Sequence, residues 1–449
     1  MTRATQTTKT PRLGRLPNRG LGERVRTLRV NAGLTQTDLA GERFSKEYVS
    51  QIERGKTRPT QETIEWLAQR LGVDPGFLAS GVSADERGRI ETALARAEAL
   101  SANHEYADSL KEFQQIRPAI LGIASPELEV RGLVGEAWAL MRAGEVKRGI
   151  ELLNRARGLT EDAMFSDVDR AEVLFRLGVS RYQLSSIQTA VALFNEALTL
   201  AERAGLPSDR LRADILHWRS RCYRRQRDFE AAQEDLERAL ELSEALDDAR
   251  AVARIYFQAS LVAERQGHWV LARKYAELAK AQYEELADRA TIGRLLNNLG
   301  GINFLLGKPE EAIEQLNESF KVLLEHGSEA DAARAVSSLA QIHLRTGRVE
   351  SAEEQARQAL KLLGDRVDVI DEIGNAQLVL GRSLLEQGRL DEAATAFDIA
   401  ERNFDQLSSI SHRASVWIAK GDLASRRGQD HAAALLYRRA AEALQDFRF

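Results

Sequence analysis

The chain has few of the residues that mark disulfide-bonded, metal-binding or membrane proteins. Its 449 residues include one cysteine, Cys222, which excludes an internal disulfide framework and a cysteine-rich zinc site. It has no run of about 18 apolar residues, and no apolar core follows the basic N-terminus, so we predict neither a membrane span nor a secretory signal. Eight prolines are few for this length and favour long helices. We therefore expect an all-α protein of the reducing cytoplasm.

The residue patterns of common enzymes are also missing. The triplet Gly55-Lys56-Thr57 resembles the end of a phosphate-binding loop, but Ser50 stands where that loop needs its first glycine, and no strand precedes it. The seven histidines are scattered, without an HExxH pattern. Cys222 falls inside a predicted helix, where a buried spacer is the usual role of a lone cysteine. We predict no catalytic activity, no metal site and no cofactor.

Charge is distributed unevenly along the chain. Residues 1–81 hold 14 lysines and arginines against 8 aspartates and glutamates, whereas the whole chain has 63 against 67. A basic N-terminal part on an acidic body indicates that only this part meets a polyanion; the alternative is a basic tail without a partner. We divide the chain into a basic arm (1–20), a small domain (21–80), a linker (81–89) and a long body (90–449).

The body is a repeat array with a period near 40 residues. A representative unit is LLNNLGGINFLLGKPEEAIEQLNESF, which predicts a first helix, a glycine turn and a second helix. A small residue recurs early in each second helix, and in most units a second one follows seven positions later, so that neighbouring helices can approach closely. The first set is Ser109, Gly149, Ala190, Ala232, Ala272, Ala312, Ala352, Ala393 and Ala433, and the turn glycines are Gly144, Gly267, Gly307, Gly347, Gly388 and Gly428.

This pattern resembles the tetratricopeptide repeat (TPR), with Leu-Gly pairs such as Leu177-Gly178, Leu299-Gly300 and Leu380-Gly381 in the first helices. The resemblance implies a right-handed α-solenoid of about nine helix pairs with a concave groove. The chain departs from the usual 34-residue unit in its longer period and in lacking most of the prolines at the repeat ends. Longer helices are expected in consequence.

The first helix of each pair is expected to line the groove. Three successive units carry Arg254, Arg294 and Arg334 at equivalent positions, which would form a ladder along the groove. Arginine guanidinium groups and side-chain amides can hydrogen-bond to a peptide backbone, a carboxylate or an acidic partner. The alternative is that these arginines pair with glutamates of adjacent helices on a solvated face. The predicted groove residues are Arg254, Arg294, Asn297, Arg334, Gln341 and Arg382.

The sequence of the small domain predicts about five short helices. Thr35, Ser45 and Thr60 stand at predicted helix starts, and apolar stripes such as Val49 and Ile52 follow them. The motifs Leu34-Thr35-Gln36, Val49-Ser50-Gln51-Ile52-Glu53-Arg54-Gly55 and Arg58-Pro59 resemble the helix-turn-helix domain of the XRE family of DNA-binding regulators. Between Leu39 and Glu53 the chain is one residue shorter than the common form, which predicts a tighter turn before the second helix of the motif.

The resemblance implies that the helix after Ser45 enters the major groove and presents its polar residues to base edges. Tyr48 and Trp66 are expected in the core, and Glu53 in a structural contact at the end of that helix. The predicted DNA-binding residues are Gln36, Ser45, Lys46, Glu47, Ser50, Gln51, Lys56, Thr57 and Arg58, with Arg12, Arg15 and Arg19 as an arm that could follow the backbone or enter a minor groove.

The order of the two parts resembles peptide-sensing regulators of Gram-positive bacteria. By that resemblance, we expect a homodimeric, sequence-specific DNA-binding regulator of the bacterial cytoplasm and nucleoid, whose TPR groove takes a peptide or protein ligand. Two alternatives remain open: a TPR interaction scaffold that the small domain only localises, and a phage-type or defence-linked repressor without a small ligand.

Overall fold

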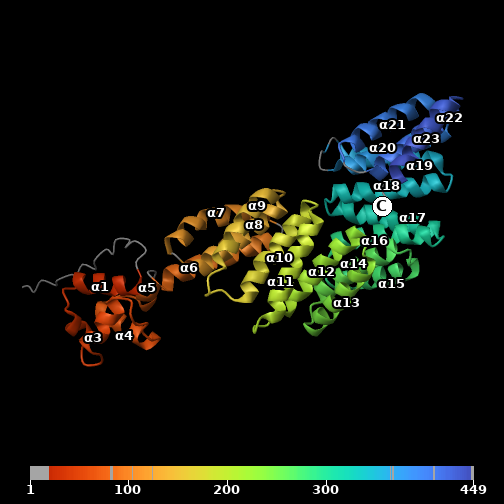
Figure 1. Cartoon of the computed structure of the whole chain (residues 1–449). Helices are drawn as coiled ribbons and strands as arrows, with labels where there is room; N and C mark the ends of the chain where they lie inside the picture. Colours follow the sequence, from red (N-terminus) through yellow and green to blue (C-terminus); the bar gives the residue numbers. More distant parts are fainter. Residues whose placement is uncertain are drawn as a thin grey trace, which may run out of the picture. The chain divides into compact units, whose positions relative to one another are not determined.

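The computed structural model describes residues 20–80, 84–103, 105–123, 125–364, 366, 369–407 and 410–445. All regular secondary structure in these ranges is helical, with 23 α-helices and no strand, which confirms the all-α prediction (Figure 1). No helix in the same ranges is both long and apolar enough to cross a membrane. The chain forms two compact units, Met1–Leu211 and Arg212–Phe449.

Five short helices form the N-terminal domain around a small apolar core. The side chains of Val25, Leu39, Val49, Ile52 and Leu67 are at most 1% exposed, so the predicted stripes do face inward. The predicted caps are also confirmed, because the side chains of residues 35, 45 and 60 each accept a hydrogen bond from a first-turn amide. The helices are α1 (Leu21–Asn31), α2 (Gln36–Ala40), α3 (Lys46–Glu53), α4 (Gln61–Leu71) and α5 (Pro75–Ser80).

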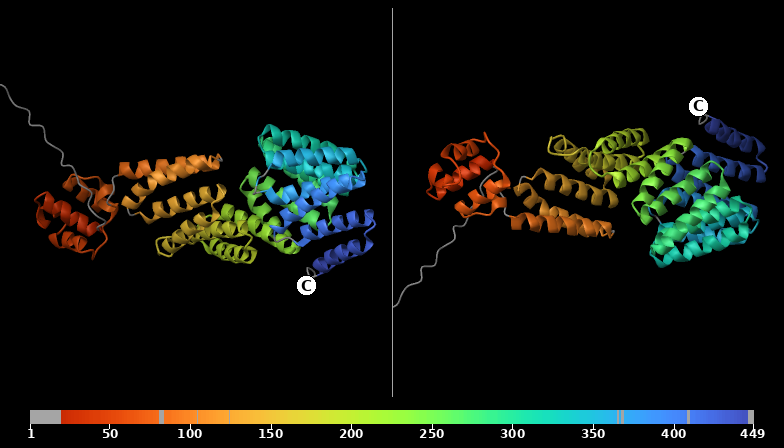
Figure 2. Two further views of the ribbon diagram at one scale, coloured as in Figure 1. Left: turned by 90° about the horizontal axis from the view of Figure 1, so that it is seen from above. Right: turned by 90° about the horizontal axis from the view of Figure 1, so that it is seen from below.

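The other eighteen helices described follow one another as nine pairs, as the repeat pattern predicts; the fourth pair is joined by the ion pair between Arg219 and Asp235, and Figure 2 gives two further views. The first of them begins at Ala84, inside the stretch predicted as a linker. The pairs are α6 (Ala84–Ala102) with α7 (Tyr106–Ile123), α8 (Pro126–Arg142) with α9 (Val146–Leu159), α10 (Asp167–Gln183) with α11 (Ile187–Arg203), α12 (Asp209–Gln226) with α13 (Phe229–Ala245), α14 (Ala249–Arg265) with α15 (Trp269–Glu285), α16 (Arg289–Leu305) with α17 (Pro309–Glu325), α18 (Glu329–Arg345) with α19 (Val349–Leu363), α20 (Ile370–Glu386) with α21 (Leu390–Asp405), and α22 (Ile410–Arg426) with α23 (Asp430–Gln445).

Small residues bring the two helices of a pair together. The nine residues predicted to mark the second helices are all buried. In the first helices, the glycine of the Leu-Gly pair lies against a bulky side chain of the partner helix: a Cβ on Gly300 would lie 2.7 Å from Cγ of Leu316, and one on Gly381 would lie 2.4 Å from Cε1 of Phe397. A larger residue would therefore push the helices apart.

From the pair α8–α9 onward, the turn inside each pair uses a left-handed backbone conformation. All six predicted turn glycines have positive φ, between 72° and 92°, a region that glycine enters without steric cost. Two equivalent turns lack glycine, and there Ser185 and Arg227 adopt φ of 59° and 63°. The turns between pairs also repeat: Asp247 and Ala287 have φ of 52° and 53°, and each is followed by an aspartate that caps the next first helix.

Candidate nucleic-acid interface and repeat surfaces

The first candidate site is the outer face of α3. Lys46, Glu47 and Gln51 are exposed on it, Ser50 is half-buried beside them, and Ser45 caps the helix by accepting a hydrogen bond from the amide of Tyr48 at 3.1 Å. The inner face of α3 is held in the core by Val49 and Ile52. The sequence-predicted base-contacting residues therefore lie together on one solvent-facing surface.

A polar cluster fixes α3 against α1 and α2. Arg29 donates to both carboxylate oxygens of Glu53, from Nε at 2.6 Å and from Nη2 at 3.2 Å, and Gln36 donates its side-chain amide to Glu53 at 2.8 Å. The side chains of Arg29 and Glu53 are only 12% and 3% exposed. Burial acts to raise the pKa of Glu53, but the hydrogen bonds from Arg29 and Gln36 outweigh it and hold that pKa below its ordinary value.

This cluster confirms the structural contact expected of Glu53, and it also gives Gln36 a structural contact that was not predicted. Gln36 was predicted to hold a DNA phosphate, whereas its side-chain amide is committed to Glu53. Arg29 was missed, because a single arginine in an amphipathic helix carries no spacing signal of its partner. Gly22 was also not predicted, because its contact lies in a distant part of the sequence. A Cβ there would lie 2.4 Å from the carbonyl oxygen of Ile52, so α1 packs directly on the backbone of α3.

The turn before α3 is filled by aromatic side chains. The ring of Phe44 lies 5.3 Å from that of Tyr48 and 5.1 Å, edge-on, from that of Trp66. Gly41 begins the turn with φ of 55°, where a Cβ would lie 2.7 Å from the guanidinium of Arg70. Tyr48 and Trp66 thus pack against the core, as predicted.

The segment after α3 presents further polar groups. Lys56 and Arg58 are exposed, and the hydroxyl of Thr57 donates to Oε1 of Gln51 at 3.1 Å. This bond ties the segment to the face of α3. The predicted arm residues Arg12, Arg15 and Arg19 lie outside the described residues, and the DNA-binding roles of the whole set stay predictions.

In the second unit, the predicted arginine ladder lies on consecutive first helices, and each arginine is ion-paired. Arg254 pairs with Asp214 at 3.0 Å, and Arg294 lies 3.7 Å from Asp331. Arg334 pairs with the same Asp331 at 2.5 Å and with Glu372 at 2.7 Å. The pairing anticipated as the alternative is therefore present, with aspartates as well as a glutamate, and it links neighbouring first helices.

Uncharged polar groups near the ladder are less fully satisfied. Nδ1 of His217, Nε2 of Gln258, Oδ1 of Asn297 and Oγ of Ser337 are buried and have no hydrogen-bond partner among the described residues. Gln258, Asn297 and Ser337 stand three or four positions after the ladder arginine of α14, α16 and α18, and His217 stands three positions after Asp214, which occupies the same register on α12. Burial and the neighbouring Arg254 hold the pKa of His217 well below its ordinary value, so this imidazole is neutral.

Two predicted groove residues lie further along. Gln341 is exposed on α18. Arg382 on α20 lines a cavity of about 600 Å³ with Arg345, Asp422 and Tyr437. Burial, partly offset by Asp422, lowers its pKa.

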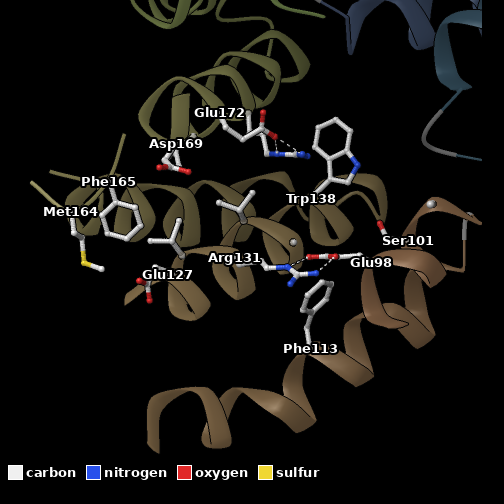
Figure 3. Close-up of a pocket in the computed structure, with 16 residues that line it drawn as sticks. Glu98, Ser101, Phe113, Glu127, Arg131, Trp138, Met164, Phe165, Asp169 and Glu172 are labelled. Atoms are coloured by element: carbon white, nitrogen blue, oxygen red, sulfur yellow. Dashed lines mark hydrogen bonds and ion pairs between the residues drawn. The ribbon is translucent and has the colours of Figure 1, made fainter. Parts of the chain in front are cut away.

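A second candidate site was not predicted. A cavity of about 580 Å³ lies among α6, α7, α8, α10 and the segment before α10 (Figure 3). Trp138, Phe113 and Phe165 line it together with charged residues, among them Arg131 and Glu172. Arg131 and Glu172 occupy the same register as the arginine ladder, so extending that register into the first repeats would have pointed to this region.

Neither metal nor thiol chemistry is indicated by the part of the chain that the structure describes. No group of three or more His, Cys, Asp or Glu residues there could hold a metal ion. Cys222 is fully buried, as expected of a spacer, and burial raises the pKa of its thiol to about 12.

Comparison with protein families identifies both parts of the chain. A model described as a helix-turn-helix domain matches residues 20–80. Models described as tetratricopeptide repeats match residues 134–207, 211–285, 291–364 and 378–446. The repeat models therefore span most of the body.

Individual proteins are similar to one part or the other. The HTH-type transcriptional regulator DdrOP3 of Deinococcus deserti is 43% identical over 63 residues, which are 14% of this chain and 49% of the regulator, so the chain spans about half the length of this relative. A Rap protein solved in complex with Competence and Sporulation Factor covers 80% of this chain and 98% of its own, with a TM-score of 0.59 and 17% identity. The quorum sensor NprR of B. thuringiensis covers 80% and 99%, with a TM-score of 0.61 and 11% identity. At these identities the two structures establish the fold alone.

Proposed function

Since the chain is a tetratricopeptide-repeat protein with an N-terminal helix-turn-helix domain of the XRE type, we propose that it is a sequence-specific DNA-binding transcriptional regulator. Its repeat domain senses a peptide or protein and thereby controls DNA binding by a homodimer. The single observation that carries the first part is the exposed polar face of α3, held on a rigid support by the buried Arg29–Glu53 pair.

The residue types on α3 suit base readout. Lysine can donate to the acceptors of guanine, glutamine can bond both edge groups of adenine, and glutamate can accept from cytosine. Lys46, Gln51 and Glu47 supply these three chemistries on one helix face. Thr57 orients the Gln51 amide through its hydrogen bond, so that the glutamine is positioned before DNA arrives. Lys56 and Arg58, exposed just after α3, then hold phosphates.

The DNA-binding proposal is tested by selecting bound sequences from a random library with the full-length protein and measuring affinity as a function of salt. Gln51→Ala should relax the preference at one base position and cost about 1–3 kcal/mol for the selected site. Lys56→Ala should weaken binding to all sequences and lower the salt slope by about 1. Lys361→Ala, at an exposed site in the repeats, is the matched control. Uniform, weak binding without a selected sequence would favour the scaffold alternative.

A dimer is proposed because a domain of this size contacts few base pairs by itself. Two copies on two half-sites reach the affinity that a regulator needs, and half-site spacing then follows a helical turn of about 34 Å. Sedimentation of the protein with and without a two-half-site duplex tests this directly. Binding of one copy per duplex at full affinity would refute it.

A peptide or protein ligand is supported by the row of polar side chains that successive first helices carry beside the ladder. Side-chain amides and hydroxyls suit the N–H and C=O groups of an extended chain; their unpaired atoms are buried in this structure, so ligand binding would have to expose them. The Rap protein, which was solved in complex with Competence and Sporulation Factor, and the quorum sensor NprR share this fold, and their names support a sensing role. Genome-wide mapping of bound DNA with and without culture supernatant tests ligand response.

Variants of these polar groups test whether the response of DNA binding to culture supernatant depends on them. Asn297→Ala and Ser337→Ala should each weaken it. The matched control is Ser338→Ala, because Ser338 stands beside Ser337 but donates its hydroxyl to the carbonyl of Arg334 in its own helix at 3.1 Å. An unchanged response in both test variants would place the ligand elsewhere. No response to supernatant in any variant would favour a repressor without a small ligand.

A further inference from the structure

We propose that the cavity among α6, α7, α8 and α10 binds an amphipathic cation: a ligand with an aromatic or branched aliphatic group beside an ammonium or guanidinium group. This inference rests on the proposed ligand-sensing function and assigns it a second site, in the first repeats, apart from the arginine ladder. The two ends of the cavity differ in chemistry, and this difference defines the ligand (Figure 3).

One end of the cavity is apolar and electrically balanced. Trp138, half-buried, forms a wall together with Phe113, and the guanidinium of Arg176 lies 4.7 Å from the centre of the indole. Arg176 is paired with Glu172 at 2.7 Å. The aromatic wall can therefore accept an apolar group without bringing an uncompensated charge into contact with it.

A second ion pair closes the same end. Arg131 binds Glu98 through two hydrogen bonds, Nε to Oε1 at 2.7 Å and Nη2 to Oε2 at 2.6 Å. This fork-to-fork geometry satisfies both groups, so neither is available to recruit a charged ligand. What remains at this end is the apolar surface of Trp138 and Phe113.

The opposite end carries negative charge without a cation. Glu127 accepts a hydrogen bond from the hydroxyl of Ser125 at 2.6 Å, and Asp169 accepts from the amide and hydroxyl of Ser166 at 2.8 and 2.7 Å. Neither carboxylate has an ion-pair partner among the described residues. Both carboxylates lie in the first turn of a helix, which stabilises their negative charge. Both also line the same cavity.

Soft, polarisable groups lie beside these carboxylates. Phe165 is buried, whereas Met164 is 50% exposed at the same end of the cavity. An aromatic face and a carboxylate together attract an organic cation. Charge complementarity therefore places the cationic group at Glu127 and Asp169 and the apolar group on Trp138, and it disfavours an anion. A volume of about 580 Å³ is in the range of sites that enclose such a ligand.

The same chemistry is offered by a basic, aromatic peptide and by a free arylalkylamine, and the experiment separates them. Calorimetric titration of the full-length protein uses three probes: an end-blocked peptide with phenylalanine between two lysines, the same peptide with glutamates in place of the lysines, and phenethylamine. The lysine peptide should bind at least about tenfold more tightly than the glutamate peptide, and its affinity should fall with added salt. Binding by phenethylamine alone would identify a small amine as the ligand class.

Variants test whether binding occurs in this cavity. Glu127→Gln combined with Asp169→Asn should weaken the lysine peptide about tenfold, and Trp138→Phe should abolish the change in tryptophan fluorescence. The matched control is Glu161→Gln, an exposed carboxylate of the nearby loop that does not line the cavity. Circular dichroism of each variant verifies that it is folded.

The inference is overturned if no cationic probe binds, if the glutamate peptide binds equally well, or if the double variant binds like the control. Selection of a specific DNA site by the same protein separates the two proposals. If that selection succeeds while every probe fails, only the cavity assignment is wrong. If the selection fails, the proposed regulatory function is wrong, whatever the probes show.

Discussion

Two adjacent glycines in α16 have opposite surroundings, and substituting each by alanine separates helix propensity from helix packing. Gly300 is buried, and a Cβ there would lie 2.7 Å from Cγ of Leu316 and 3.2 Å from the carbonyl oxygen of Ala312. Gly301 is exposed, and a Cβ there would meet no atom within 4 Å. Both stand in the interior of the same helix, so their intrinsic preferences are the same.

The expected magnitudes follow from these two environments. Alanine is better than glycine in a helix interior by about 0.8–1 kcal/mol, and Gly301→Ala should gain about that amount. Gly300→Ala gains the same propensity but overpacks a close helix contact, which costs about 1–3 kcal/mol and more where backbone must move. Because the Cβ contacts a carbonyl oxygen as well as Leu316, we expect a net loss of about 1–2 kcal/mol. The two variants should thus differ by about 2–3 kcal/mol.

Hydrogen exchange measured by mass spectrometry on the full-length protein is the suitable assay. A repeat protein opens locally, so exchange of peptides from α16 and α17 reports this contact better than one global melting curve does. Amides of α16 should exchange about 5- to 30-fold faster in Gly300→Ala, while Gly301→Ala should slow them. Equal shifts of the same sign in both variants would falsify the claim that Gly300 is retained for close packing.

Three further outcomes are expected. Glu53→Gln should cost about 2 kcal/mol, because it leaves the buried Arg29 without a counter-charge, and α3 amides should exchange about 30-fold faster. Since the folded pKa of Glu53 is depressed, its contribution is complete above about pH 4.3 and is lost as pH falls through the folded pKa, so the two proteins should converge in acid. Arg227→Gly should stabilise the α12–α13 turn by about 1 kcal/mol in chemical denaturation. Iodoacetamide at pH 8 should leave Cys222 unmodified in the folded protein and alkylate it in urea, because burial raises its thiol pKa to about 12.

Each of these has a clear contrary result. Equal exchange of α3 amides in the wild-type protein and in Glu53→Gln at neutral pH would mean that the ionised Glu53 contributes no stability. A loss of stability in Arg227→Gly would mean that this arginine makes a contact worth more than its backbone strain. Rapid alkylation of native Cys222 would show that α12 opens locally on the labelling timescale.

Much of the architecture could be predicted from the sequence because it depends on short-range patterns. The spacing of Ala272, Ala312 and Ala352 identified the packed face of the second helices, and Thr35 and Ser45 identified helix starts, since a cap acts within one turn. The polar face of α3 was predictable for the same reason, because burial of Val49 and Ile52 determines which side chains point outward.

The interactions that could not be predicted join residues far apart in the chain. Glu53 meets Arg29 across 24 positions, and Asp331 is shared by Arg294 and Arg334 from two helices. Any of many arginines and carboxylates could have made such pairs, and periodicity does not choose among them. The cavity beside Trp138 was missed because a cavity depends on which side chains fail to fill space: the register of Arg131 and Glu172 points to the region but not to the open volume.

The matching turns at Asp247 and Ala287 bear on how such a chain changes in evolution. Both positions have the same backbone conformation, and each precedes an aspartate, Asp248 or Asp288, that caps the next helix through an amide three residues on. An unequal crossover between the two turns would join two segments of the same backbone conformation and would remove or add one repeat unit in frame. The number of units, and with it the length of surface open to a ligand, can therefore vary between lineages without the selection of a new loop.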